Sequence, residues 1–271
     1  MNGFLEKMRA SRPLIHTITN YVTVNDCANI LLAAGASPVM ADDVREVSEM
    51  ASIASGLCLN IGTLNYRTVS SMKKAGKCAA RLQKPIVFDP VGAGATVLRT
   101  KTAEKLIKAL HPTLIKGNMS EIRVLSQGQG KTAGVDALPG DECTSENAEA
   151  VLSSVSAYAK KTGAVVGVSG RIDVIASPDG RRALVYNGVP ALAAISGCGC
   201  MLSCLAAGFI AANPTDPFIA TVAAFSMMGL AGEMTQKAVG SALGSFHTHL
   251  FDAISKIDEK KLVEGANYEL R

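Results

Sequence analysis

Short apolar runs alternate with longer helical segments through residues 23–186, and this alternation constrains the fold more than any other feature of the chain. Each run has the length and composition of a buried strand. Strands that alternate with helices predict a mostly parallel sheet with helices on both faces. We expect strands at 37–40, 56–60, 85–89, 113–116, 164–168, 173–176 and 183–186, and helices at 23–34, 44–55, 66–82, 102–110 and 146–161.

The last two predicted strands flank the segment Ser177-Pro-Asp-Gly-Arg-Arg182, which is typical of a hairpin. The sheet is therefore expected to have an antiparallel edge. After residue 199 the chain is expected to be helical, with breaks near Asn213 and at 240–244. The sequence contains no internal repeat, low-complexity tract or linker, so we expect one domain over residues 1–271.

Charge and composition exclude several classes of protein. The net charge is +4 with scattered positive residues, and aromatic residues make up 4% of the chain, so no nucleic-acid partner is expected. The seven cysteines are odd in number and widely spaced, unlike a secreted disulfide framework. Charged residues occur throughout the first twenty positions, where no signal peptide is visible, and we expect a cytoplasmic location.

Two stretches without charge, 183–215 and 217–232, leave a pair of membrane helices as an alternative. The first stretch is interrupted by Asn187, Gly188 and Pro190, and it has no aromatic belt. Its many small residues suit helices that pack tightly inside a globular protein. We therefore expect no membrane partner.

Polar and glycine-rich motifs fall where the predicted parallel strands end, which is where open α/β sheets bind ligands. These motifs are Asn60-Ile-Gly-Thr63, Asp89-Pro-Val-Gly-Ala-Gly94, Lys116-Gly-Asn-Met-Ser-Glu121 and Ser169-Gly170. Asp89 could hold Mg²⁺ directly or through water, or it could cap a turn. Asn118 and Glu121 have capping-box spacing, and their alternative role is to face a phosphate through Mg²⁺ and water. Lys116 would offer a positive charge to a nucleotide phosphate, or it would be an ordinary surface lysine.

The segment Ser196-Gly-Cys-Gly-Cys-Met-Leu-Ser-Cys204 predicts a tight turn that opens directly into a buried helix. The first amides of such a helix lack internal partners and, with the helix dipole, form an anion site. Gly197 and Gly199 would allow close backbone approach, although glycines also mark ordinary turns. Cys200 at this N-terminus is expected to have a lowered thiol pKa. No second cysteine pair supplies four ligands, so structural zinc is not expected.

Taken together, these motifs resemble the hydroxyethylthiazole kinase family, a thiamine-salvage group of the ribokinase-like superfamily. The segments that carry the resemblance occur in family order and span nearly the whole chain. They are His16-Thr-Ile-Thr-Asn20, Gly35-Ala-Ser-Pro-Val-Met40, Leu59-Asn-Ile-Gly-Thr63, Asp89-Pro-Val-Gly-Ala-Gly-Ala-Thr96, Lys116-Gly-Asn-Met-Ser-Glu121, Gly134-Val-Asp136, Ser169-Gly170 and Ser196-Gly-Cys-Gly-Cys200.

The resemblance implies a ribokinase-like three-layer α/β/α fold that transfers the γ-phosphate of ATP to the primary hydroxyl of 4-methyl-5-(2-hydroxyethyl)thiazole. It also implies Mg²⁺ and a homotrimer with active sites at the subunit interfaces. Residues at matching positions receive these roles: thiazole contacts for Asn20, Val22, Met40 and Gly197; Mg²⁺ for Asp89 and Glu121; ATP contacts for Lys116, Asn118 and Ser169; and a catalytic anion hole for Gly197, Cys198, Gly199 and Cys200. Cys200 stands where relatives outside the family carry an aspartate base.

Three positions depart from the family pattern. Lys116 replaces a usual arginine and so loses the bidentate fork, Ser169 replaces a usual threonine, and Cys198 replaces a small residue or threonine. The alternatives are another small-alcohol kinase of this fold, such as one acting on hydroxymethylpyrimidine, or a non-catalytic sensor that binds thiazole or nucleotide. Asp89, Glu121 and the glycine pair argue against a sensor, because binding alone does not require all of them.

Overall fold

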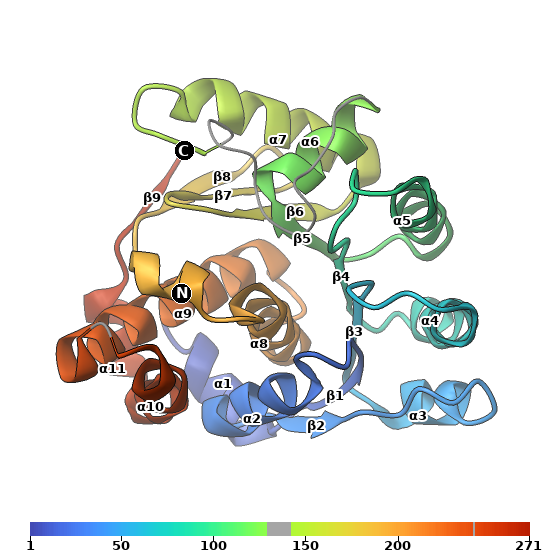
Figure 1. The fold of residues 1–271 in the computed structure, drawn as a ribbon, viewed down its shortest axis with the longest axis horizontal. Helices are drawn as coiled ribbons and strands as arrows, with labels where there is room; N and C mark the ends of the chain where they lie inside the picture. The colour runs from blue at the N-terminus through green and yellow to red at the C-terminus, as the bar shows by residue number, and fades with distance from the viewer. Residues whose placement is uncertain (129–141, 241) are drawn as a thin grey trace.

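The computed structural model describes residues 1–128, 142–240 and 242–271, so the motif Gly134-Val-Asp136 lies outside the described residues. Within them, one sheet has the strand order β2-β1-β3-β4-β5-β6-β7-β8-β9 (Figure 1). Its strands are β1 (Leu14–Ile18), β2 (Ser37–Val39), β3 (Gly56–Asn60), β4 (Ile86–Asp89), β5 (Leu114–Asn118), β6 (Val165–Ser169), β7 (Asp173–Ala176), β8 (Arg182–Val185) and β9 (Tyr268–Leu270).

The first six strands in this order pair in parallel, and β7, β8 and β9 extend the sheet in antiparallel fashion. The expected parallel sheet with an antiparallel edge is therefore confirmed. Side chains alternate between the two faces: in β4, Val87 packs into one hydrophobic cluster, while Ile86 and Phe88 pack into the other. Burial on both faces explains why these strands are continuous apolar runs in the sequence.

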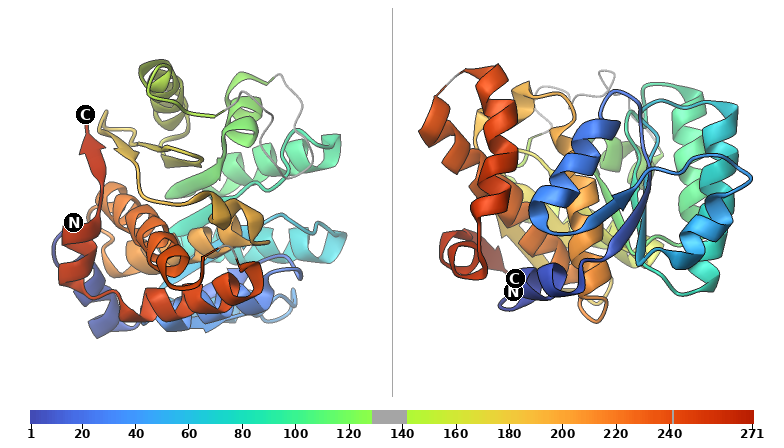
Figure 2. Two further views of the ribbon diagram at one scale, coloured as in Figure 1. Left: turned by 60° about the vertical axis from the view of Figure 1, so that its left-hand side comes forward. Right: turned by 90° about the horizontal axis from the view of Figure 1, so that it is seen from below.

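Helices form a layer on each face of the sheet, as Figures 1 and 2 show from three directions. One layer contains α3 (Val47–Ile53), α4 (Tyr66–Arg81), α5 (Val97–Leu110), α6 (Met119–Gln127) and α7 (Ala148–Thr162). The other contains α1 (Phe4–Ser11), α2 (Val24–Ala34), α8 (Cys198–Ala212), α9 (Pro217–Val239), α10 (Leu243–Lys256) and α11 (Glu259–Gly265), with the 3-10 helix η1 (Pro190–Ala194) leading into α8. A separate hydrophobic cluster fills the space beneath each layer, which confirms the three-layer α/β/α architecture.

The apolar character of α8 and α9 comes from their position against the sheet. Residues 201–210 of α8 are all buried. Helix α9 is the one helix of the described residues that is long and apolar enough to cross a membrane, and 78% of its most apolar window is buried inside the protein. The absence of charge in these segments is therefore explained by burial within the domain.

The sequence prediction missed the strand β1, which occupies the second position from one edge of the sheet. Its residues mix apolar side chains with histidine and threonine, so they do not form an apolar run. His16 is nevertheless fully buried, and its Nε2 lies 2.6 Å from the carbonyl oxygen of Ala41. Burial lowers the pKa of His16, so the ring is neutral and donates this hydrogen bond.

Several predicted helix ends also differ from the structure. Helix α5 begins at Val97, five positions before the predicted start at 102, because the Thr96 side chain accepts a hydrogen bond from the Arg99 amide and caps the helix. Helix α3 is shorter than the predicted 44–55. Helix α1 was not predicted, and strand β9 contradicts the expectation that the chain after residue 199 is helical throughout.

Candidate active site at the carboxyl ends of the strands

The parallel strands bring polar side chains together where they end. In the pairing register, Asn60 at the end of β3 lies opposite Asp89 at the end of β4. Likewise, Asn118 at the end of β5 lies opposite Ser169 at the end of β6. The clustering predicted from the sequence motifs is therefore present at this edge of the sheet.

The first turn of α8 lies at this same edge, and both of its glycines are required there. Gly197 has a φ of +85°, and a Cβ on it would lie 2.3 Å from Cγ2 of Thr23. A Cβ on Gly199 would lie 2.9 Å from Nζ of Lys116, so the ammonium group packs directly against the helix backbone. Substitution at either position would displace a neighbour, which is the physical reason for the two glycines.

Free backbone amides and a buried ammonium group therefore meet at the start of α8. Within the described part of the chain, the amides of Gly199 and Cys200 form no backbone hydrogen bond. Nζ of Lys116 lies beside them, and its side chain is almost fully buried. Helix N-terminal amides together with a cation form a site suited to phosphate.

The carboxylate of Asp89 is held beneath this turn by contacts to one of its oxygens. Oδ2 accepts hydrogen bonds from Oγ of Ser203 (2.7 Å) and Nδ2 of Asn60 (3.1 Å), and it lies 3.9 Å from Nζ of Lys116. The other oxygen, Oδ1, is buried and has no hydrogen-bond partner among the described residues. A buried acceptor without a partner is unfavourable, so Oδ1 is the atom of the site that we expect to bind a ligand.

The ionisation of the Asp89–Lys116 pair reflects its burial. Burial raises the pKa of Asp89, an effect opposed by Lys116 and by the hydrogen bonds to Oδ2. Burial acts to lower the pKa of Lys116, but the carboxylates of Asp89 and Glu121 outweigh this effect and raise it overall. Lys116 is therefore an ammonium ion, paired with a carboxylate that has lost its solvation.

Asn60 connects the two halves of the site through four hydrogen bonds. Its Nδ2 donates to Asp89 and to Sγ of Cys200 (3.2 Å). Its Oδ1 accepts from Nδ2 of Asn20 (3.1 Å) and from the Gly62 amide (2.8 Å). These four bonds use the full hydrogen-bonding capacity of one amide side chain.

The Cys200 thiol lies between two asparagine amides. Its Sγ accepts from Nδ2 of Asn20 and from Nδ2 of Asn60, each at 3.2 Å. Burial, reinforced by the charge of Asp89, raises the pKa of Cys200 to about 11. The expectation of a lowered pKa is therefore wrong, because burial of the thiolate and the charge of Asp89 outweigh the opposing effects of Lys116 and Thr23. Burial likewise raises the pKa of Cys198 to about 12.

Glu121 joins the glycine turn after β4 to the start of α6. Its Oε1 accepts from the Gly92 amide (2.7 Å), and its Oε2 accepts from the Asn118 amide (2.8 Å). Oδ1 of Asn118 accepts from the Glu121 amide in return (2.9 Å), so the predicted capping box is confirmed. Burial, followed by the charge of Asp89, raises the pKa of Glu121 to about 7.

The remaining predicted site residues lie at the rim of this cluster. Val22 follows β1 and is 69% exposed. Met40 follows the edge strand β2 and is partly buried against the hydrophobic core. Ser169 lines a small cavity with Met119 and Cys143, among other residues, at the ends of β5 and β6. The structure thus joins Asn20 to Cys200 and Asp89 to Lys116 by direct contacts, links the two pairs through Asn60, and leaves Val22 facing solvent.

Four residues that hold the site in place were not predicted as site residues. Asn60 was noted only within a motif, and Ser203 lies inside an apolar helix, where a serine was a weak signal. Thr23 donates from Oγ1 to Oδ1 of Asn20 (3.2 Å). Arg99 binds the loops after β3 and β4 by donating to the carbonyl oxygens of Ile61, Val91 and Gly62.

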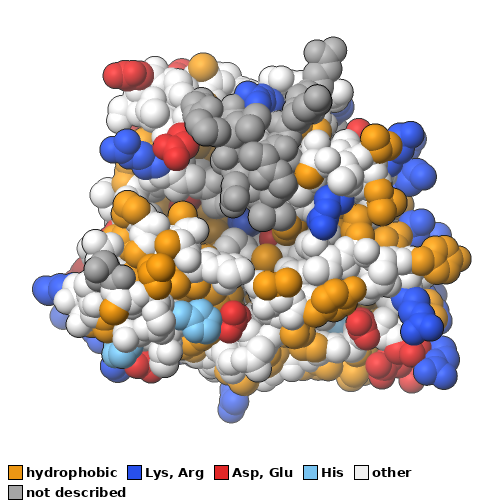
Figure 3. Space-filling view, viewed as in Figure 1, with side chains coloured by type: hydrophobic (Ala, Val, Ile, Leu, Met, Phe, Trp, Pro, Cys, Tyr) orange, Lys and Arg blue, Asp and Glu red, His pale blue; other side chains and the backbone are white. Residues whose placement is uncertain are grey.

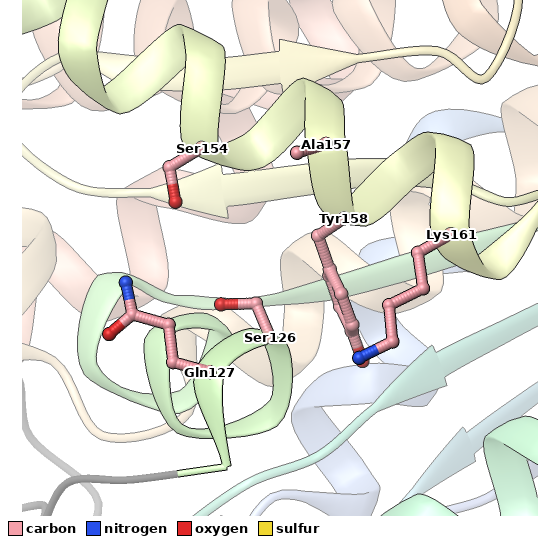
Figure 4. Close-up of a pocket in the computed structure, with 6 residues that line it drawn as sticks. All are labelled: Ser126, Gln127, Ser154, Ala157, Tyr158 and Lys161. Atoms are coloured by element: carbon pink, nitrogen blue, oxygen red, sulfur yellow. The ribbon is translucent and has the colours of Figure 1, made fainter.

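A larger hollow lies elsewhere on the surface, between α6 and α7. It has a volume of about 180 Å³ and is lined by Ser126, Gln127, Ser154, Ala157, Tyr158 and Lys161 (Figure 4). None of the predicted site residues lines it. The candidate site is therefore the cluster at the strand ends, not this larger hollow.

Comparison with solved structures first identifies the fold. A ribokinase-like superfamily protein from Enterococcus faecalis V583 has a TM-score of 0.59 at 16% identity, over 90% of this chain and 86% of that one. Pyridoxal kinase from Staphylococcus aureus has a TM-score of 0.59 at 15% identity, over 96% and 98% of the two chains. The fold is therefore that of the ribokinase-like superfamily.

Closer relatives then define the family. The model of the hydroxyethylthiazole kinase family matches residues 5–260. Hydroxyethylthiazole kinase from Clostridium acetobutylicum is 48% identical over 98% of this chain and 97% of its own length. A solved hydroxyethylthiazole kinase from Pyrococcus horikoshii OT3 has a TM-score of 0.88 at 35% identity, covering 99% of this chain and 97% of that one. The chain belongs to the hydroxyethylthiazole kinase family, which confirms the resemblance found in the sequence motifs.

Proposed function

We propose that the chain transfers the γ-phosphate of ATP to the primary hydroxyl of 4-methyl-5-(2-hydroxyethyl)thiazole, a thiamine-salvage reaction. The observation that carries this proposal is the Lys116–Asp89 pair buried against the first turn of α8. This arrangement offers an anion site and a carboxylate with one free oxygen at the same place. Family membership over nearly the whole chain supports the choice of the thiazole alcohol as acceptor.

The donor set fits Mg²⁺ bound together with nucleotide. Asp89 and Glu121 are the carboxylates that would hold the ion, and the unpartnered Oδ1 of Asp89 is a hard oxygen ligand of the kind Mg²⁺ prefers. Within the described residues, no group of three or more His, Cys, Asp or Glu residues is arranged to hold a metal ion. Mg²⁺ usually takes one or two carboxylates and completes its coordination with phosphate and water, which matches this set. When bound, it would neutralise charge on the transferring phosphoryl group.

The protein's own contribution is charge stabilisation and placement. Lys116 and the amides of residues 197–200 would face the phosphoryl group, whose transition state is loose and spreads charge over its oxygens. Asn118 and Ser169 would contact ATP at the ends of β5 and β6, while Asn20, Val22, Met40 and Gly197 would contact the thiazole. We propose these residue roles on the basis of the resemblance to the family, and the position of Asn118 and Ser169 at neighbouring strand ends supports the ATP contacts.

Cys200 would fix the position of the acceptor hydroxyl instead of removing its proton in advance. With a pKa of about 11, the thiol is protonated at neutral pH. Its Sγ already accepts from two amides, so its own hydrogen points away from Asn20 and Asn60. A loose transition state needs little early deprotonation of the alcohol, so a neutral thiol is compatible with turnover.

We also propose that residues 1–271 form one domain of a cytoplasmic homotrimer with its active sites between subunits. Exposed apolar side chains in the loop after β1 and at the starts of α4 and α5 support this assembly. Tyr21, Val22, Tyr66, Val97 and Leu98 are each between 64% and 88% exposed. Figure 3 shows hydrophobic side chains over α4 and α5 on the face seen in Figure 1. Light scattering coupled to size-exclusion chromatography would give three times the 28.1 kDa chain mass for a trimer.

The direct test is ADP release from Mg-ATP with the thiazole alcohol and hydroxymethylpyrimidine supplied separately. Turnover with the thiazole alcohol supports the proposal, and turnover only with the pyrimidine would replace it with another kinase of this fold. Binding of ATP without turnover of either alcohol would favour a sensor. The Asp89→Asn variant, which keeps the shape of the side chain, is the matched inactive control.

A further inference from the structure

We propose that Asn60 and Ser203 are positioning residues that hold one carboxylate oxygen of Asp89 and so leave its other oxygen free toward the ligand. The proposal rests on the proposed kinase function for its kinetic readout. Its structural basis is the unequal environment of the two Asp89 oxygens.

A carboxylate that is not restrained can rotate about the Cβ–Cγ bond, which turns its plane and changes where its two equivalent oxygens point. In this site both donors approach the same atom, Oδ2, from different elements: Asn60 from β3 and Ser203 from α8. Rotation of the carboxylate would break both hydrogen bonds, each of them made to a charged group. The two donors therefore fix the plane of the carboxylate, in which one oxygen is bonded and the other, Oδ1, has no partner among the described residues.

The geometry of Ser203 favours this role over ordinary helix packing. Its hydroxyl carries one hydrogen, and Oγ lies 2.7 Å from Oδ2 of Asp89 but 3.2 Å from the carbonyl oxygen of Gly199. The shorter contact to a carboxylate takes the hydrogen, since charge-assisted hydrogen bonds are the stronger ones. Ser203 is fully buried in an otherwise apolar helix, where a hydroxyl is costly unless it is bonded.

Asn60 performs a second task with the same amide group. Because its Nδ2 donates both to Asp89 and to Sγ of Cys200, its position sets the direction of the carboxylate and of the thiol together. Its Oδ1 is fixed in turn by Asn20 and the Gly62 amide, so the amide cannot flip without losing all four bonds. Asn60 therefore couples the nucleotide side of the site to the acceptor side.

The test compares Ser203→Ala with Ser203→Thr, Ser226→Ala and Asn60→Asp. Ser203→Thr keeps the hydroxyl donor. Ser226→Ala removes a fully buried serine hydroxyl from α9 that has no hydrogen-bond partner in the described residues, so it is the matched control. The measurements are the Kd of Mn²⁺ for the protein–ADP complex by electron paramagnetic resonance, kcat and KM for the thiazole alcohol, and the Tm.

For Ser203→Ala we expect Mn²⁺ binding to weaken and kcat to fall, each by roughly 10- to 100-fold, as for loss of a hydrogen bond to a charged group. KM for the thiazole alcohol should change little, Ser203→Thr should recover most of the loss, and Ser226→Ala should match the wild type. Asn60→Asp, which has the same shape but puts a second carboxylate beside Asp89, should lose more than Ser203→Ala.

A Ser203→Ala protein with a lowered Tm but unchanged Mn²⁺ affinity and kcat would overturn the proposal, because it would show a purely structural role. Equal losses in Ser203→Ala and Ser226→Ala would also overturn it. The Mn²⁺ affinity distinguishes failure of this positioning proposal from failure of the proposed kinase function. A wild-type protein that binds Mn²⁺ with ADP but phosphorylates no alcohol would refute the function, while the variants would still test the positioning.

Discussion

Replacing Gly197 by alanine tests whether the first turn of α8 depends on close approach by Thr23. The new Cβ would lie 2.3 Å from Cγ2 and 2.9 Å from Cβ of Thr23, whereas ordinary contacts are 3.4–4 Å. Displacement in a packed site costs about 1–3 kcal/mol. The φ of +85° adds about 1–2 kcal/mol for a residue that has a side chain. The free energy of unfolding should therefore fall by about 2–5 kcal/mol, or roughly 5–15 °C in Tm.

A matched control separates the two contributions. Gly163 also has a positive φ, +72°, but a Cβ placed on it meets nothing within 4 Å. Gly163→Ala should therefore lose only the backbone part, about 1–2 kcal/mol, and keep its activity. Gly197→Ala should lose more stability and also activity, because its first-turn amides are displaced.

The assay is urea unfolding followed by far-ultraviolet circular dichroism, on Gly163→Ala, Gly197→Ala, Thr23→Ser and the double variant that combines Gly197→Ala with Thr23→Ser. Serine removes Cγ2 but keeps the hydroxyl that donates to Asn20. The double variant should recover about 1 kcal/mol relative to the sum of the single changes, which exceeds the usual error of additivity. Additive effects, or equal losses at Gly163 and Gly197, would refute the close-approach argument.

Three further predictions follow from the buried charges and the thiol. Lys116→Met should lower the free energy of unfolding by about 3–5 kcal/mol, because it leaves Asp89 buried without a counter-charge. Lys116→Arg keeps the charge and should retain part of this stability in urea unfolding. Equal stability of Lys116→Met and the wild type would contradict the pairing. The pKa of Glu121 is 4.5 in the unfolded chain and about 7 in the folded protein, so the unfolded state binds fewer protons between these pH values. The free energy of unfolding of the ligand-free protein should therefore fall as pH rises from about 4.5 to about 7. Glu121→Gln should make the stability depend less steeply on pH without removing the dependence, because the pKa of Asp173 is also raised to about 7. An unchanged pH dependence of the free energy of unfolding would be evidence against the raised pKa of Glu121. Cys200→Asp should remain active in the ADP-release assay, because an aspartate can accept the same two hydrogen bonds from Asn20 and Asn60. A folded but inactive Cys200→Asp protein would contradict this prediction.

The architecture could be predicted wherever burial follows the periodicity of a strand or helix. Strands such as β3 and β4 are buried on both faces and therefore appear as apolar runs. Strand β1 did not, because His16 and Thr17 are buried through its position inside the sheet. Their burial depends on neighbours that are distant in sequence, so local composition gave no sign of it.

The site could be predicted in its backbone features but not in its side-chain network. Glycines at 197 and 199 and the capping box at 118–121 are local patterns, and the structure contains both. The bonds of Asn60 to Asp89 and Cys200 join three separate elements, and the pKa of Cys200 depends on burial created by those elements. Motif reasoning therefore pointed to the cluster at the strand ends but missed Asn60 and Ser203 and assigned the wrong direction to the thiol pKa.

The most direct test of the account is a crystal structure with Mn²⁺, a non-hydrolysable ATP analogue and the thiazole alcohol, measured with anomalous diffraction from manganese. We expect manganese near Oδ1 of Asp89, the γ-phosphate beside Lys116 and the first-turn amides of α8, and the acceptor hydroxyl beside Cys200. Manganese away from Asp89, or a phosphate bound elsewhere than the start of α8, would contradict it.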